Sequence, residues 1–304
     1  MNWRDQLQYR YNMAGVVEKL IAVNVLVFVL VFLVNTIAFL FQLPSNFLNE
    51  WLVFPEQIGE YIYKPWTIIT YAFMHAGIFH IFFNMLLLYY AGQLFLTFYT
   101  PKRLLNYYFL GAIAGALVFM LSYNIFPAFA GIGRSYLLGA SAAVMAVLVG
   151  VATQAPHMKV RLFILGNIKL WWIAAFFVIS DIVQMPFNNP GGHLAHLGGA
   201  LLGYVYTTQL QKGNDIGAWF EKLVDGLVGL FSKKEKATPF KKVYKNKDFK
   251  RNKTTSSRRS STKNGMSKTE QQQKVDAILD KISKSGYESL SKSEKDFLFN
   301  AGKD

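Results

Sequence analysis

The sequence predicts an all-α membrane protein with six membrane-spanning helices, of which the fourth is short. Three observations lead to this fold class. The 304 residues are 52% hydrophobic and only 16% charged, whereas a soluble domain carries about 25% charged residues. Long apolar segments recur over residues 1–210. One of them, residues 139–154, is shorter than the roughly 20 residues that a helix needs to cross a bilayer.

The first apolar segment, residues 20–41, contains 22 residues and no charge, which is enough to cross a hydrocarbon core of about 30 Å. It is too long for a cleaved signal peptide, and no small-residue cleavage site follows it, so we expect a retained span. Five further apolar segments predict the remaining spans, at residues 71–96, 105–124, 139–154, 170–187 and 193–210.

Basic residues in the short loops predict the orientation, because Lys and Arg are retained on the cytoplasmic side. Only Lys64 and Arg134 fall on one side of the predicted spans. Eight fall on the other: Arg4, Arg10, Lys19, Lys102, Arg103, Lys159, Arg161 and Lys169. We therefore expect both termini in the cytoplasm and the loop 42–66 outside.

The net charge of +14 is concentrated in the tail, defined as residues 211–304. The tail holds 22 of the 32 Lys and Arg and 12 of the 18 Asp and Glu, a net charge of +10. Because this charge is tethered to a membrane body, it favours anionic lipid as a partner over nucleic acid.

The tail also predicts three segments of its own. Apolar residues at helical spacing indicate an amphipathic helix at the membrane surface, and the Lys- and Ser-rich stretch after it lacks the apolar residues needed to fold. Ser291 and Glu294 are spaced as a capping box before a last helix. We expect a six-span domain over 1–210, an interfacial amphipathic helix over 211–232, a basic disordered linker over 233–272 and a small helical hairpin over 273–304.

The absence of cysteine excludes disulfides, a thiolate nucleophile and cysteine-ligated metal centres. Polar groups inside predicted spans are costly and are therefore functional candidates. Four of the five histidines, His75, His80, His193 and His196, fall near the outer ends of the second and sixth spans.

Helix geometry places several polar residues at a similar depth. Asn84 lies about 9 Å below the outer end of the second span if that helix begins near Ile78. His80 lies one turn above Asn84 on the same face. His196 lies about 5 to 6 Å below the start of the sixth span. Because the fourth helix is short, the segment before it must dip into the membrane and lower Ser141 to this level. A serine and an imidazole near a helix N-terminus are typical of acyl transfer.

Three segments resemble motifs of the rhomboid intramembrane serine proteases, in the same order along the chain. Gly139-Ala140-Ser141-Ala142 is similar to their G-x-S-G nucleophile motif, and residues 195–203, AHLGGALLG, are similar to their A-H-x-x-G-x-x-x-G base motif. His80-x-x-x-Asn84 is similar to their oxyanion motif, and Trp66 has the spacing of their first-loop tryptophan. The resemblance covers about residues 15–210.

The resemblance implies a bacterial-type six-span intramembrane serine endopeptidase with a cytoplasmic C-terminal extension, located in the plasma (bacterial inner) membrane. It implies a dyad of Ser141 as nucleophile and His196 as general base with no third acid, and an oxyanion hole from His80, Asn84 and the Ser141 N–H. Substrates would be transmembrane segments cut near their outer face, and no cofactor or metal is implied. Supporting positions would be Gly139, Met145, His75, His193, Gly199 and Gly203.

The sequence departs from the family pattern at Ala142, Met145 and Thr67, where a second Gly, a Tyr and an Arg are common. These changes leave the dyad intact, so we expect altered specificity or rate. Asp181, in the fifth span, is expected to be a buried, hydrogen-bonded helix-packing residue rather than the acid of a catalytic triad. Two alternatives remain open: a catalytically inactive relative that binds transmembrane helices, and a membrane protein that binds a metal or haem through its four clustered histidines.

Overall fold

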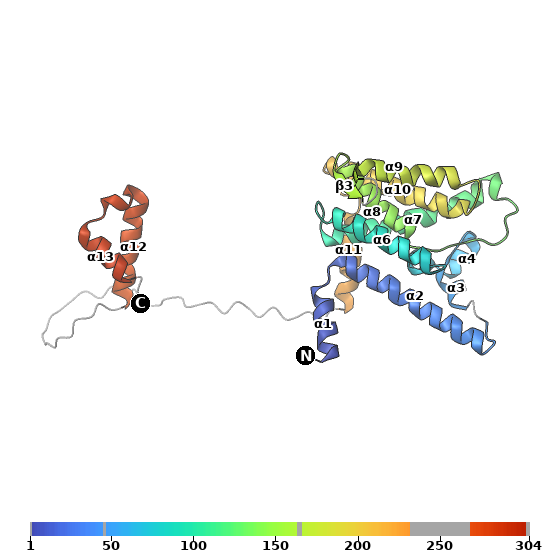
Figure 1. The fold of residues 1–304 in the computed structure, drawn as a ribbon, viewed down its shortest axis with the longest axis horizontal. Helices are drawn as coiled ribbons and strands as arrows, with labels where there is room; N and C mark the ends of the chain where they lie inside the picture. The colour runs from blue at the N-terminus through green and yellow to red at the C-terminus, as the bar shows by residue number, and fades with distance from the viewer. Residues whose placement is uncertain (1, 45–46, 163–165, 232–267, 302–304) are drawn as a thin grey trace. The chain divides into compact units, whose positions relative to one another are not determined.

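The computed structural model describes residues 2–44, 47–162, 166–231 and 268–301 and is almost entirely helical (Figure 1). The chain divides into two compact units, Met1–Glu235 and Lys236–Asp304. The first unit contains every residue predicted for the site.

Helices of the first unit follow one another along the chain with short connections. The long helices are α2 (Val16–Leu40), α6 (Ile78–Phe95), α7 (Pro101–Ile125), α8 (Ser141–Gln154), α9 (Leu170–Gln184) and α10 (Pro190–Gln211). The shorter or peripheral ones are α1 (Trp3–Met13), α3 (Phe47–Leu52), α4 (Ile58–Tyr63), α5 (Thr67–Thr70), η1 (Tyr71–Phe73), η2 (Pro127–Phe129) and α11 (Ala218–Phe231).

Helix α8 forms the centre of the first unit. It packs against α10, α7, α6 and α9 and lies among them in Figure 1, and ten of its residues are buried. Small residues permit this packing: a Cβ added to Gly199 or Gly203 on α10 would collide with the carbonyl oxygens of Ala142 and Ala146 on α8. The two backbones are thus in direct contact, as small-residue helix pairs in membranes allow.

Within the described residues, three helices are long and apolar enough to cross a membrane, namely α2, α6 and α7, and α8 and α9 are shorter apolar helices. Most side chains of α2 face outward: only 11% of its most apolar stretch is buried by protein, as expected for a helix surrounded by lipid. The predicted count of six spans stays a prediction.

Two short antiparallel β-ladders hold loop segments of the first unit in place. In the first, β1 (Phe54–Pro55) pairs with β2 (Tyr136–Leu137), which ties the loop 42–66 to the segment that leads into α8. The Glu56 carboxylate strengthens this tie by accepting the Ser135 N–H at 3.1 Å. In the second ladder, β3 (Lys159–Leu162) pairs with β4 (Gly166–Lys169) and connects α8 to α9.

A helix follows α10, but it begins at Ala218 and not at the predicted residue 211, because α10 continues to Gln211 and a turn follows it. This helix, α11, contacts the first turns of α7. Lys102 pairs with Asp225 at 2.9 Å, and Asn106 donates to Glu221 at 2.8 Å. Phe220 of α11 packs on Phe109 of α7. The attachment of this helix to a membrane surface stays a prediction.

The second unit contains α12 (Lys268–Ser285), η3 (Tyr287–Ser289) and α13 (Lys292–Ala301). The predicted capping box is confirmed, because Ser291 N–H donates to Glu294 Oε2 at 2.8 Å and Glu294 N–H donates to Ser291 Oγ at 3.4 Å. The backbone bond from Ser291 and the Lys281 ammonium lower the pKa of Glu294 to about 2. Most of the predicted linker, residues 233–267, lies outside the described residues. Residues 268–272, predicted to be disordered, are helical, so the last unit's first helix begins earlier than the predicted residue 273.

Candidate active site

Ser141 is the first residue of α8, and the turn before it requires glycine. Gly139 has φ +117, a conformation that L side chains disfavour, and its N–H donates to Tyr71 O at 3.0 Å. A Cβ at Gly139 would also lie 2.8 Å from the Nε2 of His80. Gly139 therefore allows the turn to place Ser141 beside the His80 ring.

The side chain of Ser141 lies beside that of His196 on α10. Ser141 Oγ lies 2.6 Å from His196 Nε2, across 55 residues of sequence. The direct contact of the α8 and α10 backbones at Gly199 makes this distance possible. The structure therefore brings together the predicted nucleophile and the predicted base.

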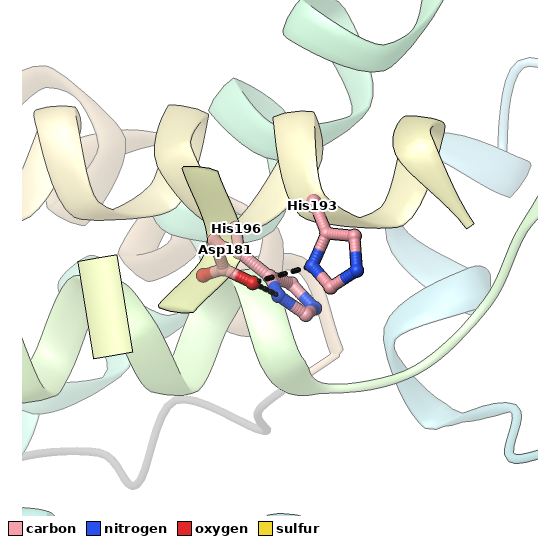
Figure 2. Close-up of side chains that lie close together, drawn as sticks. All are labelled: Asp181, His193 and His196. Atoms are coloured by element: carbon pink, nitrogen blue, oxygen red, sulfur yellow. Dashed lines mark hydrogen bonds and ion pairs between the residues drawn. The ribbon is translucent and has the colours of Figure 1, made fainter. Parts of the chain in front are cut away.

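Asp181 of α9 lies beside both His193 and His196, as Figure 2 shows. Its Oδ1 is 2.8 Å from His196 Nδ1 and 2.7 Å from His193 Nδ1. A carboxylate oxygen only accepts hydrogen bonds, so both Nδ1 atoms carry a proton. Neutral His196 then presents an unprotonated Nε2 to Ser141. Asp181 is thus buried and hydrogen-bonded, as expected, and it contacts the predicted base from the neighbouring helix.

His80 and Asn84 occupy successive turns of α6. The Ala76 N–H donates to His80 Nδ1 at 3.3 Å, so the proton of a neutral His80 ring is on Nε2, the atom beside Gly139. Asn84 is buried and its Nδ2 donates to His80 O at 2.9 Å, which uses one of its two amide protons. The Ser141 N–H belongs to the first turn of α8, where main-chain donors have no partner within the helix. These residues supply three kinds of N–H donor, namely an imidazole, a side-chain amide and a main-chain amide.

The remaining predicted positions each make contacts of their own. His75 donates from Nδ1 to Phe73 O at 3.3 Å and packs its ring against His80, with 5.1 Å between ring centroids. Met145 is buried one turn along α8 from Ser141. Trp66 stacks on Trp51, and its Nε1 donates to Trp51 O at 2.8 Å, so it fastens the loop 42–66. Thr67 is buried and bonds to Lys64 O.

The four histidines do not gather as one group in the described part of the chain. The side chains there that could share a metal ion are Asp181, His193 and His196, whose ligand atoms lie within 4.8 Å of one another. His75 and His80 are not members of this group. The three side chains are already joined by hydrogen bonds, which favours proton handling over a four-histidine centre.

Residues 63–212 match the family model described as the rhomboid domain. The chain belongs to the rhomboid family. The second match, over residues 263–300, is to a family of unknown function, DUF6576. Together with its apolar helices, the rhomboid domain makes the chain a multi-pass membrane protein.

Several rhomboid relatives are similar to the chain. The mitochondrial Rhomboid protein 1 of Saccharomyces cerevisiae is 28% identical over 67% of this chain and 56% of the relative. The mitochondrial RHOMBOID-like protein 12 of Arabidopsis thaliana is 28% identical over 48% and 47%. Rhomboid-like protease 3 of Toxoplasma gondii is 25% identical over 55% and 60%. The chain therefore spans about half of the length of these relatives.

The contact between Asp181 and His196 is the feature that sequence reasoning missed. The sequence held one signal for it: Asp181 is the only charged residue between Leu170 and Gln184. An ionisable residue in an apolar helix requires a partner. The spacing alone could not show that the partners are His193 and His196.

Proposed function

We propose that the chain is an intramembrane serine endopeptidase with Ser141 as nucleophile and His196 as general base. The observation that carries the proposal is the 2.6 Å distance between Ser141 Oγ and His196 Nε2, with the tautomer of His196 that can accept a proton. The three rhomboid motifs and the family membership support it.

In this mechanism His196 Nε2 takes the proton of Ser141 as Oγ attacks a carbonyl carbon of the substrate, and an acyl-enzyme forms when the protonated imidazole returns a proton to the leaving amine. Water then attacks the acyl-enzyme with the same proton transfers, which restores Ser141. Every proton that leaves a nucleophile thus passes through His196 Nε2.

The negative charge on the substrate oxygen needs donors during each attack. His80 Nε2, the free amide proton of Asn84 and the Ser141 N–H are the groups available to it. Each such donor typically lowers the barrier by about 2.7–4 kcal/mol. The dipole of α8, which begins at Ser141, favours negative charge at the same point.

The substrates we propose are transmembrane segments, cut near the outer face of the membrane. A transmembrane helix satisfies its own backbone hydrogen bonds, so cleavage requires a segment that unwinds locally, at Gly, Pro or polar residues. Both termini in the cytoplasm remain part of the proposal, supported by the charge of the predicted loops. The plasma-membrane location also remains part of it, on the resemblance to the bacterial type alone.

The basic tail is proposed to bind anionic lipid. On α11, Trp219 and Leu223 are exposed and suit the membrane surface. The helix itself carries Glu221 and Asp225 against Lys222, so the positive charge comes from the sequence after it, which begins with Lys233, Lys234 and Lys236. When the full chain is in nanodiscs, we expect anionic lipid to protect α11 from proteolysis. Added salt should reduce this protection. Equal protection in neutral lipid would contradict this.

The test of the activity compares the parent, Ser141→Ala and His196→Ala on a transmembrane reporter in liposomes. We expect cleavage to fall by at least about 10³-fold in both variants, and a serine-directed fluorophosphonate to label the parent but not Ser141→Ala. The matched control is Ser122→Ala, because Ser122 is a buried helical serine whose Oγ only bonds Val118 O. It should cleave like the parent.

Two results would contradict the proposal. Cleavage by Ser141→Ala at the parent rate would show that another residue is the nucleophile. A parent protein that neither cleaves reporters nor reacts with the probe would favour the catalytically inactive relative that binds transmembrane helices.

A further inference from the structure

We propose that Asp181 is a positioning residue that completes a Ser141–His196–Asp181 triad, and that His193 holds the Asp181 carboxylate in place. This inference rests on the proposed function. It adds an acid from α9 to a nucleophile from α8 and a base from α10, so that three helices meet at one chain of hydrogen bonds. Figure 2 shows the part of this chain between Asp181 and His196.

The geometry supports a triad. From Ser141 Oγ to His196 Nε2 is 2.6 Å, and from His196 Nδ1 to Asp181 Oδ1 is 2.8 Å, both within the range of strong hydrogen bonds. The two bonds use the two nitrogens of one ring. His196 therefore has one tautomer and one ring orientation, which are the two properties that the acid provides in a catalytic triad.

Burial makes the carboxylate effective. Asp181 is only 7% exposed, so its interaction with His196 is weakly screened by water. A lone buried charge would be destabilising. Here hydrogen bonds from two Nδ1–H groups offset the loss of hydration of the carboxylate. An Asp that merely packed two helices would need only one such partner, and neither of its partners would need to contact a nucleophile.

His193 contributes the second bond. It lies one turn before His196 on α10 and donates from Nδ1 to the same Oδ1 at 2.7 Å. Its Nε2 lies 3.3 Å from Asn188 Oδ1. For a neutral ring that is protonated at Nδ1, the Asn188 amide must be turned so that Nδ2 donates to this nitrogen. His193 thus holds the Asp181 carboxylate in place from one side, and His196 donates its Nδ1–H to the same carboxylate from the other.

The proton balance needs no further group. When Ser141 Oγ bonds to the carbonyl carbon, its proton moves to His196 Nε2, and the ring becomes a cation with protons on both nitrogens. Asp181 stays ionised and keeps accepting the Nδ1–H. The ion pair formed in this step stabilises the cation, and it disappears when Nε2 passes its proton to the leaving amine.

The central experiment substitutes Asp181→Asn in the full chain. Asn keeps the size and an Oδ1 that accepts both Nδ1–H groups, but it removes the charge. We expect kcat to fall by about 10²-fold or more with KM within about threefold of the parent. The rate at which the fluorophosphonate labels Ser141 should fall in parallel. Asp181→Glu, which restores a carboxylate, should recover at least about tenfold of the loss.

His193→Ala tests the second step of the inference. Loss of one of two bonds to Asp181 should lower kcat by about tenfold, less than Asp181→Asn. The matched control is Tyr107→Phe, which removes a buried hydrogen bond of 2.7 Å to Thr207 of α10, far from Ser141. It should lower the midpoint of thermal unfolding without changing kcat.

The results separate the inference from the proposed function. If the parent cleaves and Asp181→Asn has a kcat within about threefold of it, Asp181 is only a packing residue and the inference is wrong. If the parent neither cleaves nor labels, the proposed function fails and the triad with it.

A spectroscopic measurement keeps the test independent of how the Asp181 variants fold. Proton NMR of Ser141→Ala with ¹⁵N-labelled histidine should show hydrogen-bonded Nδ1–H signals from His193 and His196, because Asp181 remains in place. Signals from Nε2–H tautomers at His196 would overturn the inference.

Discussion

A polar cluster of buried and half-buried residues lies beside each half of helix α10, and the two clusters differ in what their protons can do. The N-terminal cluster consists of Ser141, Asp181, His193 and His196, joined at 2.6 to 2.8 Å. The C-terminal cluster consists of Arg103, Asn106, Tyr206, Asp215 and Glu221. In it, Tyr206 and Arg103 donate to Asp215 at 2.9 and 2.8 Å, and Asn106 donates to Glu221 at 2.8 Å.

Both clusters pair an acid with two donors, but only one has a member that can exchange its proton near neutral pH. A guanidinium and a phenol ordinarily keep their protons there, whereas an imidazole gains and loses one. The C-terminal cluster is therefore suited to joining α7, α10 and α11. The N-terminal cluster makes similar contacts between helices and adds a nucleophile, so burial and bonding alone do not distinguish a site from a structural network.

The largest expected effect comes from breaking both clusters at once. In Gly199→Val, the Cβ would collide with the Ala142 carbonyl oxygen, so α10 must move away from α8 and carry His196 away from Ser141. We expect a destabilisation of about 3 kcal/mol or more and loss of cleavage, measured by thermal unfolding in detergent and by the reporter assay.

The matched control for this substitution is Gly226→Ala in α11, where an added Cβ meets nothing within 4 Å. It should be neutral or stabilising, because Ala is the better helix former. A Gly199→Val protein with the parent's midpoint and activity would show that the two helices do not need their close contact.

A medium effect is expected from breaking the C-terminal cluster alone. Burial raises the pKa of Asp215, but hydrogen bonds from Tyr206 and Arg103 outweigh it, so this pKa lies below its ordinary value of 3.8. The carboxylate therefore stabilises the fold above about pH 4, and this contribution is lost as the pH falls through the lowered pKa.

Asp215→Asn should lower the free energy of unfolding by about 1 kcal/mol at neutral pH and leave kcat unchanged. Unfolding midpoints between about pH 6 and about pH 3 should fall less steeply for the variant than for the parent. A fall in kcat at neutral pH would mean that the two clusters are coupled through α10. Parallel pH curves would show that Asp215 is not the titrating group.

These two clusters also show what the sequence could and could not predict. Ser141, His80, Asn84 and His196 could be identified because their spacing follows motifs along the chain. The start of α6 at Ile78 agrees with the expected position, since apolar periodicity and a preceding glycine are local signals. Helix α10 begins at Pro190, earlier than the predicted span at 193, because Asn189 caps it through the Gly192 N–H.

Contacts between helices that no sequence motif records could not be predicted. Asp181 and His196 are 15 residues apart on separate helices, and only the packing of α9 against α10 decides that they meet. The same holds for Arg103 and Asp215, whose pairing depends on how the chain turns after α10. Periodicity predicts which face of a helix is buried, but it does not identify the residue that the face contacts.

The smallest expected effect concerns packing beside the N-terminal cluster. Met145 is buried one turn from Ser141, where a Tyr is common in the family. Because Leu and Met have similar volumes, Met145→Leu should cost less than about 1.5 kcal/mol and change kcat by less than about threefold. Met120→Leu on α7, also buried, is the matched control in the unfolding and cleavage assays. If Met145→Leu alone lowered kcat by about tenfold, the thioether sulfur would take part in holding His196. The difference between the clusters would then depend on packing as well as on proton exchange.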